Sequence, residues 1–111
     1  MIEIILAIAI GFLAGIITGL IPGIHINLLA AMIISSLPLL LNYLSPLPII
    51  IFITAMSLTH IFLDAIPSSF LGAPESSVLA VMPTHKLLLK GQGYDAIRLL
   101  SIGSFLGIIS I

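Results

Sequence analysis

The stretch "GFLAGIITGLIPGIHIN", residues 11–27, combines a ladder of glycines with a Pro-Gly break. Gly11, Gly15 and Gly19 are four residues apart, so they share one face of a helix as consecutive G-x-x-x-G units. This pattern lets a second helix approach closely in lipid, and we predict that the three glycines are packing residues. The proline removes a backbone donor and disfavours a helical residue before it, so the helix is predicted to bend or end near Ile21.

The rest of the chain is strongly apolar. Hydrophobic residues make up 60% of the 111 residues, charged residues make up 6%, and the mean hydropathy is +1.40. No Asp, Glu, Lys or Arg occurs between Glu3 and Asp64, whereas about 18 uncharged apolar residues already predict a membrane span. The composition therefore predicts an all-α integral membrane protein. Three basic residues and a net charge of −1 exclude nucleic acid as a partner.

Four apolar blocks are separated by polar or turn-forming segments. The blocks cover residues 4–21, 28–41, 49–66 and 96–111, and the polar segment 67–95 is predicted to be cytoplasmic or re-entrant. Two prolines and a tyrosine between the second and third blocks predict a hairpin turn. The last block is short for a full span. We expect all 111 residues to form a single transmembrane domain, a multi-span bundle with broken or re-entrant helices, that is the amino-terminal part of a longer, repeat-built protein.

The break at Pro22-Gly23 is the first candidate site. A discontinuous helix presents unpaired N–H groups and the positive end of a helix dipole, which together bind anions. Asn27 is predicted to cap a helix that begins at Leu28, and His25 is predicted to donate a hydrogen bond to a carboxylate. A hairpin turn at the membrane surface, with His25 and Asn27 in water, explains the same spacing equally well.

The third block carries a polar stripe. At 100° per residue, one side of the predicted helix holds Thr54, Ser57, His60 and Asp64. His60 and Asp64 are candidates for coupling to an ion, H⁺ or Na⁺, because ionisable residues inside membranes commonly form ion or proton pathways. The alternative is that the two side chains satisfy each other at the helix end. We predict no cofactor and no metal site, because the chain lacks a zinc-hydrolase motif such as H-E-x-x-H.

Two serine pairs near prolines complete the predicted substrate region. Ser68-Ser69 and Ser76-Ser77 are typical of helix entrances, and two such entrances suit a re-entrant element that lines a substrate cavity. An ordinary capped loop is the alternative. We predict that these serines bind substrate together with the four residues named at the break, Pro22, Gly23, His25 and Asn27.

The basic residues set the expected orientation. Lys86, Lys90 and Arg98 are the only Lys and Arg residues, so the positive-inside rule predicts that this segment is cytoplasmic. Three crossings before it would place Met1 outside. Gly91-Gln92-Gly93 is predicted to end a short cationic helix within the segment.

Two segments resemble one known family. "GFLAGIITGLIPGIHIN" is similar to the G-x-x-x-G-x-x-x-G-x-x-P-G motif near the amino end of the large permease subunit of tripartite tricarboxylate transporters, the TctA type. "SSFLGAPESSVLAVMPTHKLLLKGQGYDAIRL" is similar to a later segment of that family, in which small residues and a proline precede a basic residue and a glycine. His25 and Ala73-Pro74-Glu75 stand where bacterial members commonly have other residues, which resembles a divergent, archaeal branch. Family members are several times longer than this chain.

The resemblance implies a permease subunit of a secondary transporter, not an enzyme, in the cytoplasmic membrane. It implies transport of a small organic anion, a carboxylate, driven by an ion gradient, and no ATP-binding G-x-x-x-x-G-K-[ST] motif is present. The implied partners are membrane lipid, the remaining part of the permease, a small membrane subunit and a solute-binding protein. Two alternatives stay open: a small structural membrane subunit without transport activity, and an intramembrane serine hydrolase, for which a nucleophile motif such as G-x-S-G is missing.

Overall fold

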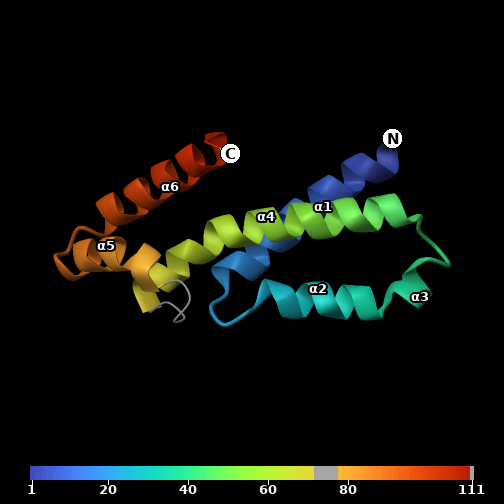
Figure 1. Ribbon diagram of the computed structural model, residues 1–111, viewed down its shortest axis with the longest axis horizontal. Coiled ribbons are helices and arrows are strands. Elements are labelled where there is room, and N and C mark those ends of the chain that lie inside the picture. The colour runs from blue at the N-terminus through green and yellow to red at the C-terminus, as the bar shows by residue number, and fades with distance from the viewer. Residues whose placement is uncertain (72–77, 111) are drawn as a thin grey trace. The chain divides into compact units, whose positions relative to one another are not determined.

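The computed structural model describes residues 1–71 and 78–110, and every regular element in these two ranges is a helix. The chain divides into two compact units, Met1–Leu63 and Asp64–Ile111, each of which is described by itself (Figure 1). The predicted all-α class is confirmed.

Among the described residues, two helices are long and apolar enough to cross a membrane. They are α1 (Ile2–Leu20), with a mean hydropathy of 2.3, and α4 (Pro46–Leu71), with 2.0. The 19 residues of α1 extend over about 28 Å at 1.5 Å per residue, close to the roughly 30 Å of a hydrocarbon core. Between them lie the shorter helices α2 (Ile26–Ser35) and α3 (Leu37–Leu40).

Helices α1 and α4 run in the same direction. Successive α1 glycines face α4 residues whose numbers rise in step: Gly11 faces Phe52, Gly15 faces Met56 and Gly19 faces His60. Because the two helices are parallel, the chain between them must return along their length, and α2 runs back in the opposite direction (Figure 1). The first unit therefore pairs two parallel helices, α1 and α4, with α2 antiparallel to both.

The contact between α1 and α4 depends on small residues, and we call it the glycine seam. The buried residues of α1 recur at every fourth position, Ala7, Gly11, Gly15 and Gly19. A Cβ atom at Gly15 would lie 2.6 Å from the main-chain oxygen of Met56 and 2.6 Å from the Cβ atom of Thr59. No real side chain fits such a gap, so the two backbones meet directly.

The second unit consists of the end of α4, the helix α5 (Val78–Leu89) and the helix α6 (Gly93–Ile109). A Schellman motif ends α5: Gly91 N–H donates to Leu88 O at 2.9 Å and Gln92 N–H donates to Leu87 O at 3.0 Å. Gly91 has φ +77°, a conformation that favours glycine. The predicted helix end at Gly91-Gln92-Gly93 is therefore confirmed, and α5 and α6 form a hairpin.

Two predicted boundaries differ from the structure. The apolar block 28–41 is divided at Ser36 into α2 and α3, and Pro38 lies in the first turn of α3, where a missing N–H costs least. The third block does not end at Ile66, because α4 continues to Leu71 with Pro67 inside it. Proline is tolerated within membrane helices when neighbouring groups satisfy the freed backbone.

Candidate functional site

The Pro-Gly break lies between α1 and α2. Helix α1 ends at Leu20, one residue before the predicted end. Gly23 has φ +88°, and a Cβ atom there would have nothing within 4 Å. Glycine is therefore favoured at this position by the backbone conformation and not by close approach of another group.

The start of α2 corrects one prediction. The helix begins at Ile26, so Asn27 lies inside its first turn and does not cap a helix that begins at Leu28. His25 takes the N-cap position because its backbone is extended, with φ −97° and ψ 123°, and its carbonyl already accepts hydrogen bonds from Leu28 N–H and Leu29 N–H. His25 and Asn27 are both exposed, and no side chain caps the helix. The free N–H groups of this first turn are open to water or an anion.

The depth of the break follows from the length of α1. A helix of about 28 Å that crosses a core of about 30 Å ends near the opposite membrane surface. If α1 crosses the membrane along its whole length, the uncapped start of α2 lies toward that surface and not at the midplane.

His60 is part of the glycine seam. Its side chain is 3% exposed, and its Nδ1 atom lies 3.0 Å from Thr18 Oγ1. The Thr18 hydroxyl also lies 2.9 Å from Ala14 O. When this hydroxyl donates its one hydrogen to Ala14 O, His60 Nδ1 donates to Thr18 Oγ1, and Nε2 is the acceptor of the neutral imidazole. Sequence reasoning did not include Thr18, although its place beside Gly19 in the ladder was a signal.

A second polar cluster joins the end of α4 to α5. Ser69 Oγ lies 2.9 Å from Thr84 Oγ1, and the two side chains are 2% and 7% exposed. Ser69 Oγ also lies 2.7 Å from Ala65 O, and Thr84 Oγ1 lies 2.7 Å from Val81 O. The hydroxyl groups of Ser69 and Thr84 carry one hydrogen each, and they make three contacts in all. One of the three contacts therefore lacks a hydrogen at any moment.

His85 completes this cluster. Its Nδ1 atom donates to Ser69 O at 2.8 Å, a carbonyl in the last turn of α4 that has no partner within the helix. The imidazole therefore engages the main chain of Ser69 and not its hydroxyl, which is not the arrangement of a serine nucleophile and its base. Sequence reasoning missed Thr84 and His85, and their place directly after Pro83 was the available signal.

The predicted serines have different positions. Ser68 and Ser69 lie inside α4 and not at a helix entrance, because α4 continues through Pro67 and Ser69 bonds back to its own helix. Ser68 is half-buried. Ser76 and Ser77 lie outside the described residues. Asp64 is half-buried on α4.

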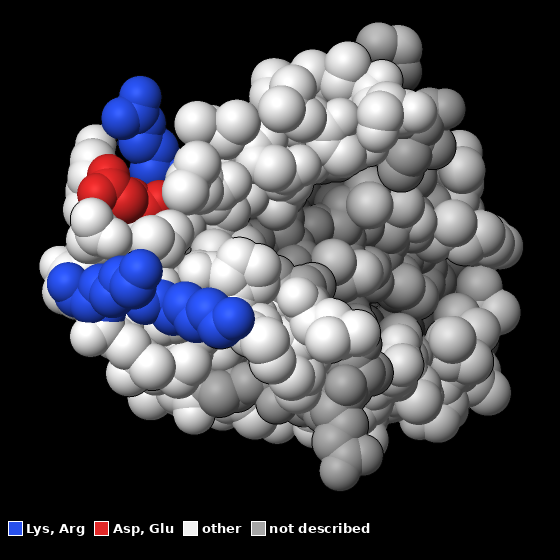
Figure 2. All heavy atoms as spheres, turned by 60° about the vertical axis from the view of Figure 1, so that its left-hand side comes forward, with Lys and Arg blue, Asp and Glu red and all other residues white. Residues whose placement is uncertain are grey.

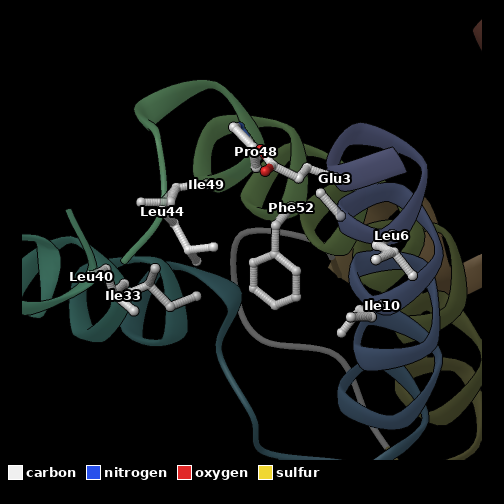
Figure 3. Close-up of a pocket in the computed structure, with 10 residues that line it drawn as sticks. Glu3, Leu6, Ile10, Ile33, Leu40, Leu44, Pro48, Ile49 and Phe52 are labelled. Atoms are coloured by element: carbon white, nitrogen blue, oxygen red, sulfur yellow. The ribbon is translucent and has the colours of Figure 1, made fainter. Parts of the chain in front are cut away.

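The first unit also contains an apolar cavity of about 440 Å³ (Figure 3). Phe52 extends into the space between α1 and the α2–α3 segment, and Glu3 is the one charged residue of the lining. None of the predicted substrate residues lines it. An organic anion would lose its hydration there without gaining a positive partner, so this cavity does not suit such a substrate.

Comparisons with known proteins agree with the sequence resemblance. The family model described as the tripartite tricarboxylate transporter TctA family matches residues 5–111. An uncharacterized protein of Methanocaldococcus jannaschii is 41% identical over 108 residues, which cover 95% of this chain and 26% of that protein. The chain thus spans about a quarter of the length of this curated relative. No solved structure matches the chain significantly.

Proposed function

We propose that this chain, which belongs to the tripartite tricarboxylate transporter TctA family, forms part of a permease that moves a small organic carboxylate through the cytoplasmic membrane. Family membership makes the chain a component of a membrane transporter. The proposal adds the carboxylate, a multi-pass arrangement, and partners: the remaining part of the permease, a small membrane subunit and a solute-binding protein.

The observation that carries the proposal is the uncapped start of α2 after the break. Its first-turn N–H groups have no side-chain cap, and the helix dipole adds a partial positive charge at this end. Pro22 and Gly23 create this end, and His25 and Asn27 are exposed beside it. A carboxylate accepts hydrogen bonds from N–H groups and from imidazole, so the chemistry of this segment fits the substrate class.

We further propose that the uptake is coupled to an ion gradient of H⁺ or Na⁺ through His60 and Asp64. His60 is buried in the glycine seam and its Nδ1 atom contacts Thr18 Oγ1; a buried ionisable side chain in a helix long enough to span a membrane supports a role in proton movement. Ser68 and Ser69, with Ser76 and Ser77, remain candidates for substrate contact.

The test uses the full-length permease in cells and compares two glycines with positive φ. Gly23→Leu and Pro22→Ala should abolish carboxylate uptake, because each changes the backbone that exposes the start of α2. Gly91→Leu is the matched control, since Gly91 also has a positive φ and open space around it but ends α5. All three variants should reach normal membrane abundance.

His25→Ala should weaken substrate binding by about 1.5–3 kcal/mol, the range of a charge-assisted hydrogen bond. Wild-type uptake by both Pro22→Ala and Gly23→Leu would show that the break has no role in substrate binding.

A further inference from the structure

The α5–α6 hairpin is polarised along its length. Four charged residues, Lys86, Lys90, Asp95 and Arg98, lie within 13 residues around the turn, and all four are exposed. Residues 99–110 of α6 carry no charge, and the start of α5 is apolar. One end of the hairpin is therefore charged and the other is compatible with lipid. Figure 2 shows the basic side chains gathered at one end of the visible face.

Tyr94 indicates the depth of the α5–α6 turn relative to the lipid headgroups. It is 80% exposed in the first turn of α6, inside the charged segment from Lys86 to Arg98 and one turn before the apolar remainder of the helix. Exposed tyrosines of membrane proteins concentrate at the headgroup level, where the ring meets both water and acyl chains. The hairpin thus enters the membrane with its turn among the lipid headgroups.

The charge at this level is positive. Three basic residues and Asp95 give a net charge of 3 − 1 = +2 between Lys86 and Arg98. Lys86 lies in the last turn of α5 and Lys90 follows the helix directly, four positions later, so their ammonium groups emerge close to each other at this end of the hairpin. Like charges at this spacing repel each other, and an anion between them removes that repulsion.

We propose that Lys86 and Lys90 bind the phosphodiester headgroup of an anionic membrane lipid. The phosphate oxygens accept hydrogen bonds from both ammonium groups, and the acyl chains follow exposed apolar side chains next to them, of which Leu89 is 76% exposed. A free carboxylate substrate fits the lysines but leaves Leu89 uncovered. This inference rests on the second unit alone and does not depend on the transport function.

The experiment uses tyrosine fluorescence, because the chain has two tyrosines and no tryptophan. The 111-residue chain with Tyr43→Phe is reconstituted into bilayers of phosphatidylcholine and spin-labelled phosphatidylglycerol, and quenching of Tyr94 gives the preference for the anionic lipid. The reciprocal variant, Tyr94→Phe, reports the lipid around Tyr43, which is 81% exposed next to a turn without basic residues. Helical circular dichroism is recorded for each variant.

Tyr94 should report a clear preference for phosphatidylglycerol, and Tyr43 should report none. Lys86→Gln with Lys90→Gln should lower the preference at Tyr94 by roughly 10- to 30-fold, and raised salt should lower it in the parent protein. Lys86→Arg with Lys90→Arg should retain it, since both charges stay. Equal preference at the two tyrosines, an unchanged preference in the glutamine variant, or displacement of the lipid by millimolar citrate would overturn the proposal. If the lysines only stabilise the end of α5, the glutamine variant loses helicity without a change in lipid preference.

Discussion

Replacing Gly15 by alanine tests whether the direct backbone contact in the glycine seam holds α1 and α4 together. The added Cβ atom would lie 2.6 Å from Met56 O and 2.6 Å from Thr59 Cβ, whereas ordinary contacts begin at 3.4 Å. The helices must therefore separate locally by about 0.8 Å, from 3.4 − 2.6, because a main-chain oxygen of α4 cannot turn aside. Such overpacking costs about 1–3 kcal/mol.

Gly107→Ala is the matched control on α6. A Cβ atom there would have nothing within 4 Å, and Gly107 is exposed in a helix. Both substitutions gain up to about 1 kcal/mol of helix propensity, so the difference between the two variants isolates the overpacking cost in the seam. Unfolding free energies are measured for both in the same detergent. We expect Gly15→Ala to be less stable than Gly107→Ala by about 1–3 kcal/mol.

Equal stability of the two variants would refute the reasoning, because it would mean that α1 and α4 are not held together at Gly15. A smaller helical signal in Gly15→Ala alone would point to a local change in α1 instead. The circular dichroism of both variants is therefore compared at low temperature.

Three further predictions follow from the polar contacts and the charges. Thr18→Val leaves His60 Nδ1 buried without its hydrogen-bond partner and should cost about 1–3 kcal/mol, measured as above; a cost near zero would show that water replaces Thr18. His85→Ala removes a donor to Ser69 O at the end of α4, whereas Ser69→Ala leaves the Thr84 hydroxyl bonded to Val81 O. His85→Ala should therefore destabilise the protein more than Ser69→Ala, and the reverse order in thermal unfolding would contradict this. Gln92→Cys should react with a membrane-impermeant maleimide only after the cells are opened, and labelling of sealed cells would contradict the cytoplasmic orientation.

Local patterns in the sequence predicted the helix ends well. The Pro-Gly pair marked the end of α1 to within one residue, and Gly91-Gln92-Gly93 marked the end of α5. Both signals act on backbone conformation within a few residues, so they do not depend on the rest of the fold. The prediction that Asn27 caps the helix was wrong because His25, the extended residue before α2, takes the N-cap position. Residue type alone does not determine which residue has the extended backbone.

The sequence pattern did not predict which distant segments contact each other. The G-x-x-x-G ladder predicts a close partner helix but does not say that α4 is the partner, because many apolar helices offer a suitable surface. For the same reason the sequence offered Asp64, four residues away, as one possible partner of His60, and it did not point to Thr18 on α1, which the His60 Nδ1 atom contacts. Pro67 was interpreted as a helix start, since the freed backbone of a proline inside a helix leaves no mark in the sequence.

The parallel pairing of α1 and α4 has a consequence for biosynthesis. Each α1 glycine meets an α4 residue 41 positions later, as in 52 − 11 for Gly11 and Phe52. At about 5–20 residues per second, the ribosome needs roughly 2–8 s to make that interval. Helix α1 therefore enters the membrane with its glycine face uncovered and waits several seconds for α4. During that time a chaperone or a neighbouring helix can occupy the face, so the rate of translation through residues 20–60 influences how much protein assembles correctly.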